Sequence, residues 1–152
     1  MAGEARDACG VVGIYAPGED VARLTYYGLY ALQHRGQESA GIAISDGQTI
    51  VVYKELGLVA QAFDETVLQS LRGFVSIGHT RYSTTGSSSW DNAQPTYKSS
   101  PKGQIALAHN GNLVNSVELA ASLKEAGGDP TPKGARLRST SDTDLVAAHI
   151  AR

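Results

Sequence analysis

Residues 9–16, CGVVGIYA, are typical of a buried β-strand that begins at the single cysteine of the chain. The two glycines inside this stretch leave room for close backbone neighbours, and residues 17–18 (Pro-Gly) end it. After Asp20 the apolar period lengthens, which predicts a helix capped by that carboxylate. The residues expected on one face of this helix are Val21, Leu24, Gly28 and Leu32.

Further strands follow in pairs. Two β-branched stretches, residues 39–44 and 49–53, flank Asp46-Gly47, a strong signal for a hairpin. Apolar runs at 74–78 and 105–108 predict two more strands. Antiparallel-looking strand pairs with helices before and after predict a layered α+β fold.

Helices and one long loop fill the remaining sequence. Asp64 is expected to cap a short helix, and Asn112 is expected to cap an amphipathic helix. Ser141 is expected to begin the last helix. Residues 83–103 are polar and are expected to form a functional loop. No stop signal follows the last helix before Arg152, so we expect a domain that is incomplete at its C-terminus.

Composition restricts the class of protein. The chain has 152 residues, 41% of them apolar, which suits one globular domain rather than a disordered segment. A net charge of −2 lacks the basic footprint of a nucleic-acid binder. There is no apolar run of the roughly 20 residues that a membrane helix needs, and no apolar core of a secretory signal. With one cysteine, these features predict a soluble cytoplasmic domain.

Cys9 is the first candidate for chemistry. A free cysteine is usually a small buried apolar residue, and composition alone favours that role. If residues 1–8 were removed, however, Cys9 would carry a free α-amine with a pKa of roughly 7.7–8.0 beside its own thiol. That amine could serve as the general base for a nucleophilic thiol.

Three polar segments supply further candidates. Arg81 follows an apolar strand and could bind a carboxylate, although a solvated salt bridge is the ordinary interpretation. Asn110 and the N–H of Gly111 could form an oxyanion hole, or simply a turn. Asp142 and Asp144 lie in the first turn of the last helix, where carboxylates favour the helix dipole; this explanation suffices for Asp144. The four histidines are scattered, and structural roles are expected for them rather than zinc binding: His34, His79, His109 and His149.

Taken in order, six segments resemble the glutaminase domain of the amidophosphoribosyltransferase family, whose members are class II glutamine amidotransferases. The six segments are residues 9–14 (CGVVGI), 32–42 (LQHRGQESAGI), 78–84 (GHTRYST), 92–95 (NAQP), 109–113 (HNGNL) and 141–144 (SDTD). The resemblance covers the chain from Cys9 onward. It implies an α+β fold of the N-terminal-nucleophile hydrolase type, a four-layer αββα sandwich, incomplete at the C-terminus.

The resemblance also implies roles for individual residues. Cys9 would be the nucleophile, exposed by removal of a propeptide, residues 1–8, and residues 9–152 would be the truncated glutaminase domain. Asn110 and Gly111 would stabilise the oxyanion. The residues expected to bind or enclose glutamine are Arg81 (α-carboxylate), Asp142 (α-amino group), and, with less defined roles, Arg35, Tyr82 and Thr84.

The implied activity is hydrolysis of glutamine to deliver ammonia to phosphoribosyl pyrophosphate. The product would be 5-phosphoribosylamine, in the first committed step of purine (IMP) synthesis. The family's phosphoribosyltransferase domain is absent from this chain. By the same resemblance, Mg²⁺ and a [4Fe–4S] cluster would belong to the full-length enzyme, a homo-oligomer, and no cofactor or metal is expected in this segment.

Three other functions stay open on the sequence. The chain could belong to another class II amidotransferase, which the missing C-terminal domain would distinguish. It could be a thiol hydrolase with His79 or His109 as the base of Cys9, which would be active with its N-terminus blocked. It could also be a binding or regulatory module without chemistry, although the joint presence of Cys9, Arg81, Asn110 and Asp142 argues against this.

Overall fold

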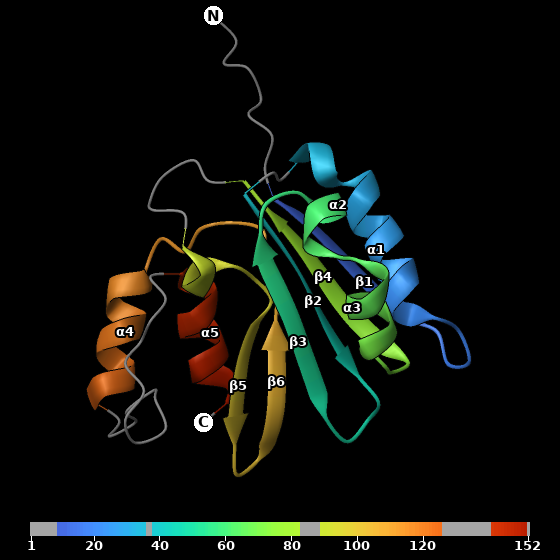
Figure 1. Cartoon of the computed structure of the whole chain (residues 1–152). Coiled ribbons are helices and arrows are strands. Elements are labelled where there is room, and N and C mark those ends of the chain that lie inside the picture. The colour runs from blue at the N-terminus through green and yellow to red at the C-terminus, as the bar shows by residue number, and fades with distance from the viewer. Residues whose placement is uncertain (1–8, 36–37, 83–88, 126–140, 152) are drawn as a thin grey trace, which may run out of the picture.

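The computed structural model describes residues 9–35, 38–82, 89–125 and 141–151. In this part of the chain, three helices cover one side of a four-stranded sheet, and a two-stranded sheet backed by two helices faces the other side (Figure 1). The layer order is therefore helix, sheet, sheet, helix. This confirms the predicted α+β class and the αββα order of its layers.

The bounds of the elements are as follows. The strands are β1 (Gly10–Tyr15), β2 (Ser39–Ser45), β3 (Ile50–Leu56), β4 (Val75–Arg81), β5 (Thr96–Ser100) and β6 (Gly103–Leu107). The α-helices are α1 (Val21–Ala31), α2 (Val59–Ala62), α3 (Glu65–Ser70), α4 (Ser116–Glu125) and α5 (Asp142–Ile150). Two short 3₁₀ turns are η1 (Gln33–Arg35) and η2 (Trp90–Asn92).

The larger sheet has the strand order β1-β4-β2-β3, and every neighbouring pair is antiparallel. The predicted hairpin is confirmed, since β2 and β3 pair from Ser39↔Leu56 to Ser45↔Ile50 around the Asp46-Gly47 turn. Gly47 has φ +90°, which explains the glycine, and Asp46 accepts hydrogen bonds from the N–H groups of Gln48 and Thr49. The turn therefore fixes the register of the two strands.

Helix α1 packs on β1, β4 and β2 and forms most of the outer layer with α2 and α3. Asp20 caps it as predicted, because its carboxylate accepts from the N–H of Arg23. The predicted face is confirmed at Val21, which is buried, and at Gly28, which lies against Val12 of β1, but not at Leu24, which is 41% exposed. The residues of α1 that are buried are Val21, Ala22, Thr25 and Leu29. Thr25 can face the core because its hydroxyl binds the carbonyl of Val21 and the hydroxyl of Ser76.

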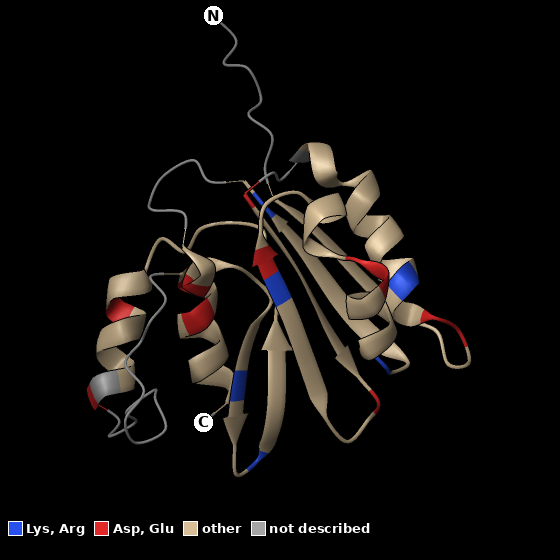
Figure 2. Ribbon diagram, viewed as in Figure 1, with Lys and Arg blue, Asp and Glu red and all other residues tan. Residues whose placement is uncertain are grey.

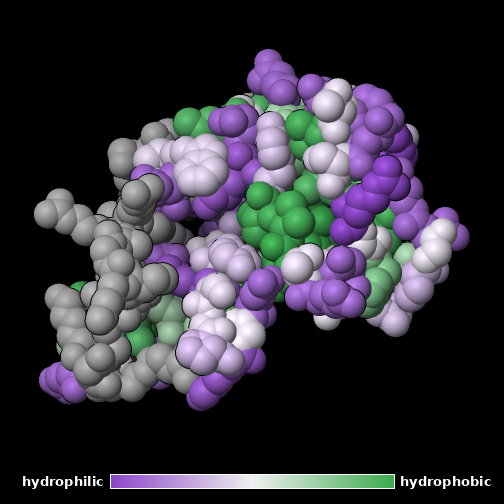
Figure 3. Space-filling model, turned by 60° about the horizontal axis from the view of Figure 1, so that its bottom comes forward, coloured by the Kyte–Doolittle hydropathy of each residue, from purple (hydrophilic) through white to green (hydrophobic). Residues whose placement is uncertain are grey.

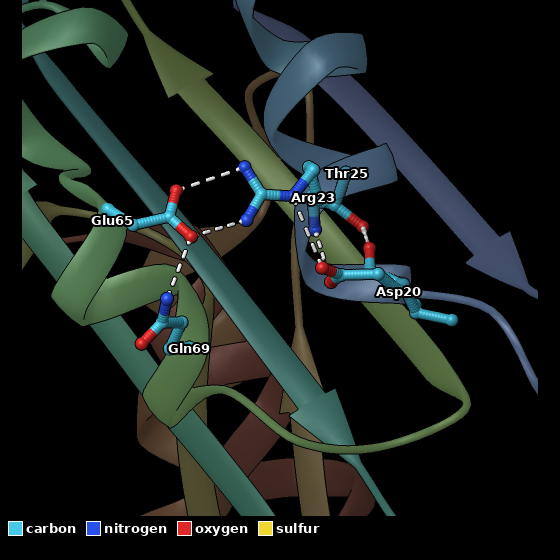
Figure 4. A network of polar contacts seen from close by, with 6 residues as sticks. Asp20, Arg23, Thr25, Glu65 and Gln69 are labelled. Carbon is cyan, nitrogen blue, oxygen red and sulfur yellow. Dashed lines mark hydrogen bonds and ion pairs between the residues drawn. The ribbon is translucent and has the colours of Figure 1, made fainter.

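An exposed ion-pair network joins α1 to α3 (Figure 4). The guanidinium of Arg23 forks onto the carboxylate of Glu65, at 3.1 and 2.6 Å, and its Nε contacts Asp20. Gln69 donates to the same Glu65 carboxylate. These bonds raise the pKa of Arg23 and lower the pKa of Glu65. Because the side chains face solvent, the network adds little stability and mainly fixes the register of the two helices.

The second sheet corrects the prediction of a long polar loop at residues 83–103. The second half of that segment contains β5, which pairs with β6 from Thr96↔Leu107 to Ser100↔Gly103. Helix α5 packs on both strands. Asn112 does not cap the following helix, which begins at Ser116, whereas Ser141 does cap α5 by accepting from the N–H of Thr143.

The segment that enters β5 packs directly on Gly41 of β2. A β-carbon placed there would overlap the backbone oxygen of Gln94 and lie 2.9 Å from Cδ of Pro95. Pro95 follows a cis peptide bond and is fully buried. Glycine at position 41 is therefore required by space rather than by backbone conformation.

At β1 the inner side of the larger sheet is less covered. Val11 is 42% exposed and Tyr15 71% exposed. They lie on the face of β1 opposite to Val12, which packs toward α1.

Seen from the end of the molecule that carries the hairpin turns, apolar residues gather at the centre of the face (Figure 3). None of the helices in the described ranges has the length and apolar character needed to cross a membrane.

The close approach of the sheets generates a stability prediction. We expect Gly41→Ala to lower the free energy of unfolding by about 2–3 kcal/mol, because the new methyl group meets backbone that cannot move aside. Gly13→Ala is the matched control, since a β-carbon there meets nothing within 4 Å. Urea unfolding of the three chains measures the difference. Equal midpoints for both variants would contradict the assigned packing.

Candidate functional site

Cys9 and Asn110, which are 101 residues apart, meet at one end of the two sheets. The side-chain amide of Asn110 donates to the backbone carbonyl of Cys9 at 2.5 Å. The Cys9 thiol is partly exposed and contacts the carbonyl of Tyr82 at 3.8 Å. In the described part of the chain, no histidine forms a hydrogen bond with this thiol. The arrangement therefore does not provide the Cys–His pair of a thiol hydrolase.

Cys9 is placed by the strand that follows it. The N–H of Gly10 donates to the hydroxyl of Thr80 at 3.2 Å, and Gly10 pairs with Thr80 in the sheet. A β-carbon on Gly10 would lie 2.8 Å from that hydroxyl. The thiol thus lies at the first residue before a buried strand, with its backbone held by β4.

Gly111, the second oxyanion candidate, has φ +153°, a conformation that side chains rarely adopt. A β-carbon there would lie 3.0 Å from Nε2 of His109. Both conditions favour glycine, whose N–H lies in the same loop as the Asn110 amide. The structure therefore brings the predicted nucleophile beside a loop that carries the predicted oxyanion donors.

Two buried side chains hold the residue before Asn110. The N–H of His109 donates to Oε1 of Gln94 at 2.8 Å, and Nε2 of His79 lies 3.3 Å from the carbonyl oxygen of His109. His79 has no exposed surface, and burial lowers its pKa to about 4, aided by the nearby charges of Arg81 and His109 and opposed by the bond to the His109 carbonyl. His79 is therefore a neutral ring in a structural position, as the sequence analysis expected for a histidine.

Arg81 ends β4, as predicted, and its side chain is largely buried. Its Nε lies 3.6 Å from the carboxylate of Glu38, and its Nη1 donates to the carbonyl of Asn92 at 2.8 Å. The backbone of Glu38 also donates to the carbonyl of Arg81. These contacts engage Nε and Nη1, and a guanidinium carries five N–H donors, so Arg81 has further N–H groups with which to bind the carboxylate of a ligand.

The turn that contacts Arg81 is fixed on β3. Lys54 donates to the carbonyl of Ala93 at 2.6 Å and lies 4.7 Å from the centre of the Trp90 ring. The indole N–H of Trp90 donates back to the carbonyl of Lys54. Burial lowers the pKa of Lys54, while the nearby carboxylate of Asp144 opposes the shift. These contacts connect the inner face of the large sheet to the segment that leads into β5.

The two acidic residues that begin α5 have different roles. Asp142 accepts from the N–H of Leu113 at 2.7 Å, which brings it to the loop of Asn110 and Gly111. Asp144 is buried and binds Thr96 and Lys98, each at 2.8 Å, so the helix dipole alone does not account for it. Figure 2 shows the acidic positions at the end of α5 that lies next to the loops.

Some predicted residues cannot be placed. Thr84 and residues 1–8 lie outside the described residues, and of Arg35 only the backbone, in η1, is described. Tyr82 is 43% exposed and contributes its carbonyl to the Cys9 thiol. The structure therefore brings together Cys9, Asn110, Gly111 and Asp142, with Arg81 at the end of the strand that leads to Tyr82.

Sequence reasoning missed three residues of this site: Glu38, His79 as a holder of the loop, and Gln94. All three lie inside the segments that carried the resemblance. Their residue types gave no separate signal, because a glutamate, a histidine and a glutamine are ordinary surface residues until a fold buries them. Only the burial and the partners identify them.

The described residues contain no group of three or more His, Cys, Asp or Glu side chains that could hold a metal ion. The chain also has one cysteine, whereas a [4Fe–4S] cluster is held by four thiolates. The residues present therefore do not fit an iron–sulfur cluster in this segment.

Comparisons with known proteins agree with this geometry. The amidophosphoribosyltransferase of Mycobacterium tuberculosis is 56% identical to the chain over 147 residues, which are 96% of this chain and 28% of that protein. A solved glutamine phosphoribosylpyrophosphate amidotransferase from B. subtilis, complexed with ADP and GMP, is 40% identical, with a TM-score of 0.77 over 93% of this chain and 29% of that one. A structure described as the allosteric regulatory enzyme of purine biosynthesis has a TM-score of 0.80 at 40% identity, over the same shares of both chains. No protein-family model matches.

The buried histidine generates a pH prediction. The pKa of His79 is about 4 in the folded chain against an ordinary value of 6.5, so folding favours the neutral ring. Its contribution to stability is complete above pH 6.5 and is lost as the pH falls toward 4, because the unfolded chain then binds a proton that the folded chain refuses. We expect about 2–3 kcal/mol of this loss between pH 7 and pH 4.5.

The measurement is urea unfolding at both pH values for the wild type and for His79→Gln, which cannot titrate. Other groups contribute equally to both chains, so the difference between them isolates His79. His34→Gln, at an exposed histidine of η1 whose ring contacts the carbonyl of Ala31, controls for the substitution itself. The same pH dependence in His79→Gln and the wild type would contradict the assignment.

Proposed function

Because the chain is a relative of the amidophosphoribosyltransferases over nearly all of its own length, we propose that it is their glutaminase part. It spans only about 28% of the length of the relatives that it matches, so the activity of a whole enzyme enters here as part of the proposal. In this proposal the chain hydrolyses glutamine to glutamate and ammonia.

The observation that carries the proposal is the contact between Asn110 and Cys9. The side-chain amide of Asn110 donates to the backbone carbonyl of the residue that carries the thiol, at 2.5 Å and across 101 positions of sequence, and the next residue is a glycine. Hydrolysis of an amide needs this combination, because the attacked carbonyl develops a negative oxygen. Neither an ordinary turn nor a buried apolar cysteine requires it.

The mechanism begins with release of residues 1–8, which gives Cys9 a free α-amine. The thiol transfers its proton to that amine and its sulfur attacks the side-chain amide carbon of glutamine. Asn110 Nδ2–H and the Gly111 N–H donate to the oxyanion, each contribution being worth about 2.7–4 kcal/mol in comparable enzymes. The C–N bond breaks, the amine returns the proton to the departing nitrogen, and ammonia leaves a thioester that water hydrolyses to glutamate.

Glutamine binding would use the remaining N–H donors of Arg81. They would bind the α-carboxylate while Glu38 and the carbonyl of Asn92 hold the guanidinium through Nε and Nη1. Asp142 would accept from the α-amino group, with its second oxygen kept on Leu113. Arg35, Tyr82 and Thr84 complete the proposed enclosure of the ligand.

In the whole enzyme, ammonia would displace pyrophosphate from phosphoribosyl pyrophosphate and give 5-phosphoribosylamine, the first committed step of purine synthesis. The acceptor substrate, Mg²⁺ and the [4Fe–4S] cluster would bind to residues outside this chain. The proposal includes a homo-oligomer located in the cytoplasm. The cytoplasm is a reducing compartment, in which the free Cys9 stays a thiol.

The first test is Cys9→Ser in the intact protein that carries this chain. We expect near-complete loss of glutaminase activity, because the hydroxyl is a poorer nucleophile of far higher pKa, while product formation from added ammonia persists. Mass spectrometry of the active wild type should show a chain that begins at Cys9. Glutamine turnover by Cys9→Ser, or by a wild type that retains Met1, would reject the mechanism.

The second test concerns glutamine recognition. Arg81→Ala removes a charge-assisted forked contact worth roughly 1.5–3 kcal/mol, so the KM for glutamine should rise about ten- to a hundredfold. Asp142→Asn should also raise the KM for glutamine. Ammonia-dependent synthesis should be unchanged in both variants. Arg23→Ala, which loses the ion pairs to Glu65 and Asp20 on the outer helices, is the matched control. Steady-state kinetics with glutamine decide the matter; an unaltered KM in both variants is incompatible with these roles.

A further inference from the structure

We propose that His79 and Gln94 are positioning residues that clamp the backbone of His109 from its two sides, and that this clamp places the Asn110 amide on Cys9. The inference rests on the proposed function for its catalytic consequence. It assigns a role to two buried side chains that never touch the substrate.

The clamp uses both backbone groups of one residue. Gln94 accepts from the N–H of His109 at 2.8 Å, and His79 reaches the carbonyl of the same residue at 3.3 Å. His79 comes from the centre of the large sheet, on β4, and Gln94 from the segment that enters β5. The loop after β6 is therefore held between the two sheets rather than by its own turn.

Burial makes these two bonds selective. His79 is 0% exposed and Gln94 8% exposed, so neither side chain has bulk water as an equivalent partner for the bond it makes to His109. A carbonyl oxygen can only accept, so the proton of a neutral His79 must lie on Nε2. Its Nδ1 is buried without a hydrogen-bond partner, and a second proton there would have no acceptor. Burial therefore lowers the pKa of His79 and keeps the ring neutral, with its one proton on Nε2, where it can donate to the His109 carbonyl.

The clamp acts on Asn110 through one peptide group. The carbonyl that His79 binds belongs to the peptide that joins His109 to Asn110, so rotation of this peptide would move the Asn110 side chain away from the Cys9 carbonyl. Gly111, next along, packs against the His109 ring and has a left-handed φ. Both proposed oxyanion donors therefore follow directly from the residue that the clamp holds.

A misplaced oxyanion donor affects the transition state more than the bound substrate. Glutamine would still be held by Arg81 and Asp142, which the clamp does not touch. Loss of the clamp should therefore lower kcat and leave the KM for glutamine nearly unchanged. A general loss of structure would change both constants and the folding transition together.

The experiment compares Gln94→Met, which keeps the volume but removes the acceptor, with His79→Leu and His79→Gln in the intact protein that carries this chain. His79→Gln restores an N–H donor of similar reach. We expect kcat for glutamine hydrolysis to fall at least tenfold in Gln94→Met and His79→Leu, with KM within twofold of the wild type. His79→Gln should recover a large part of the loss, and His34→Gln, the exposed control, should lose nothing.

Hydrogen exchange followed by mass spectrometry supplies a measurement that does not depend on activity. The amides of residues 108–112 should exchange faster in Gln94→Met and His79→Leu than in the wild type, with the strands of the large sheet unchanged. If His79→Leu fails to fold, Gln94→Met and His79→Gln carry the comparison.

The outcomes separate the two proposals. Unchanged kcat and unchanged exchange in Gln94→Met, or a raised KM with wild-type kcat, would overturn the clamp while leaving the glutaminase intact. A wild type without glutaminase activity would instead reject the proposed function, and the exchange of residues 108–112 would still decide whether His79 and Gln94 hold the loop.

Discussion

The packing of the small sheet on the inner face of the large one is the constraint on which the rest of this molecule depends. It requires a residue without a side chain at Gly41, where the backbone of Gln94 crosses β2. From that crossing, the Gln94 side chain reaches His109, and the loop after β6 reaches Cys9. A change of a few tenths of an ångström at the interface would therefore be transmitted to the site, because densely packed interiors transmit strain.

The charges near the site follow one pattern, in which each group is only partly satisfied by the protein. Arg81 has a carboxylate on one side and a carbonyl on Nη1, while both carboxylate oxygens of Glu38 lack a hydrogen bond. Asp142 uses one oxygen for Leu113. Asp144, only two residues later, binds Thr96 and Lys98 of β5, both through Oδ1. The partners separate the two acidic residues of α5, because Asp144 fixes the helix on the small sheet whereas Asp142 contacts the loop that carries Asn110 and Gly111.

Local signals in the sequence predicted local structure well. Asp20, Asp64 and Ser141 cap helices through bonds to N–H groups two or three residues away, and Asp46-Gly47 makes the expected turn. The errors have long-range causes. Strand β5 looks like a polar loop because the partner of the buried Thr96 and the half-buried Lys98 is Asp144, which lies far along the chain on α5. On α1 the prediction placed Leu24 in the buried face and omitted Thr25, whose hydroxyl is satisfied by its own helix and by Ser76. Cys9, Asn110 and Asp142 were separate candidates from their residue types, and only the family resemblance of the ordered segments connected them, since no local rule links positions so far apart.

The separation of 101 residues between Cys9 and Asn110 also has a consequence for synthesis. A ribosome exposes the cysteine long before it adds the asparagine, so the nascent chain carries a thiol without its oxyanion donors. Contacts between such distant positions form late, because closing a long loop costs entropy before any contact offsets it. Maturation of the site is thus linked to completion of the second sheet, and an interrupted chain that ends before β6 would be chemically silent.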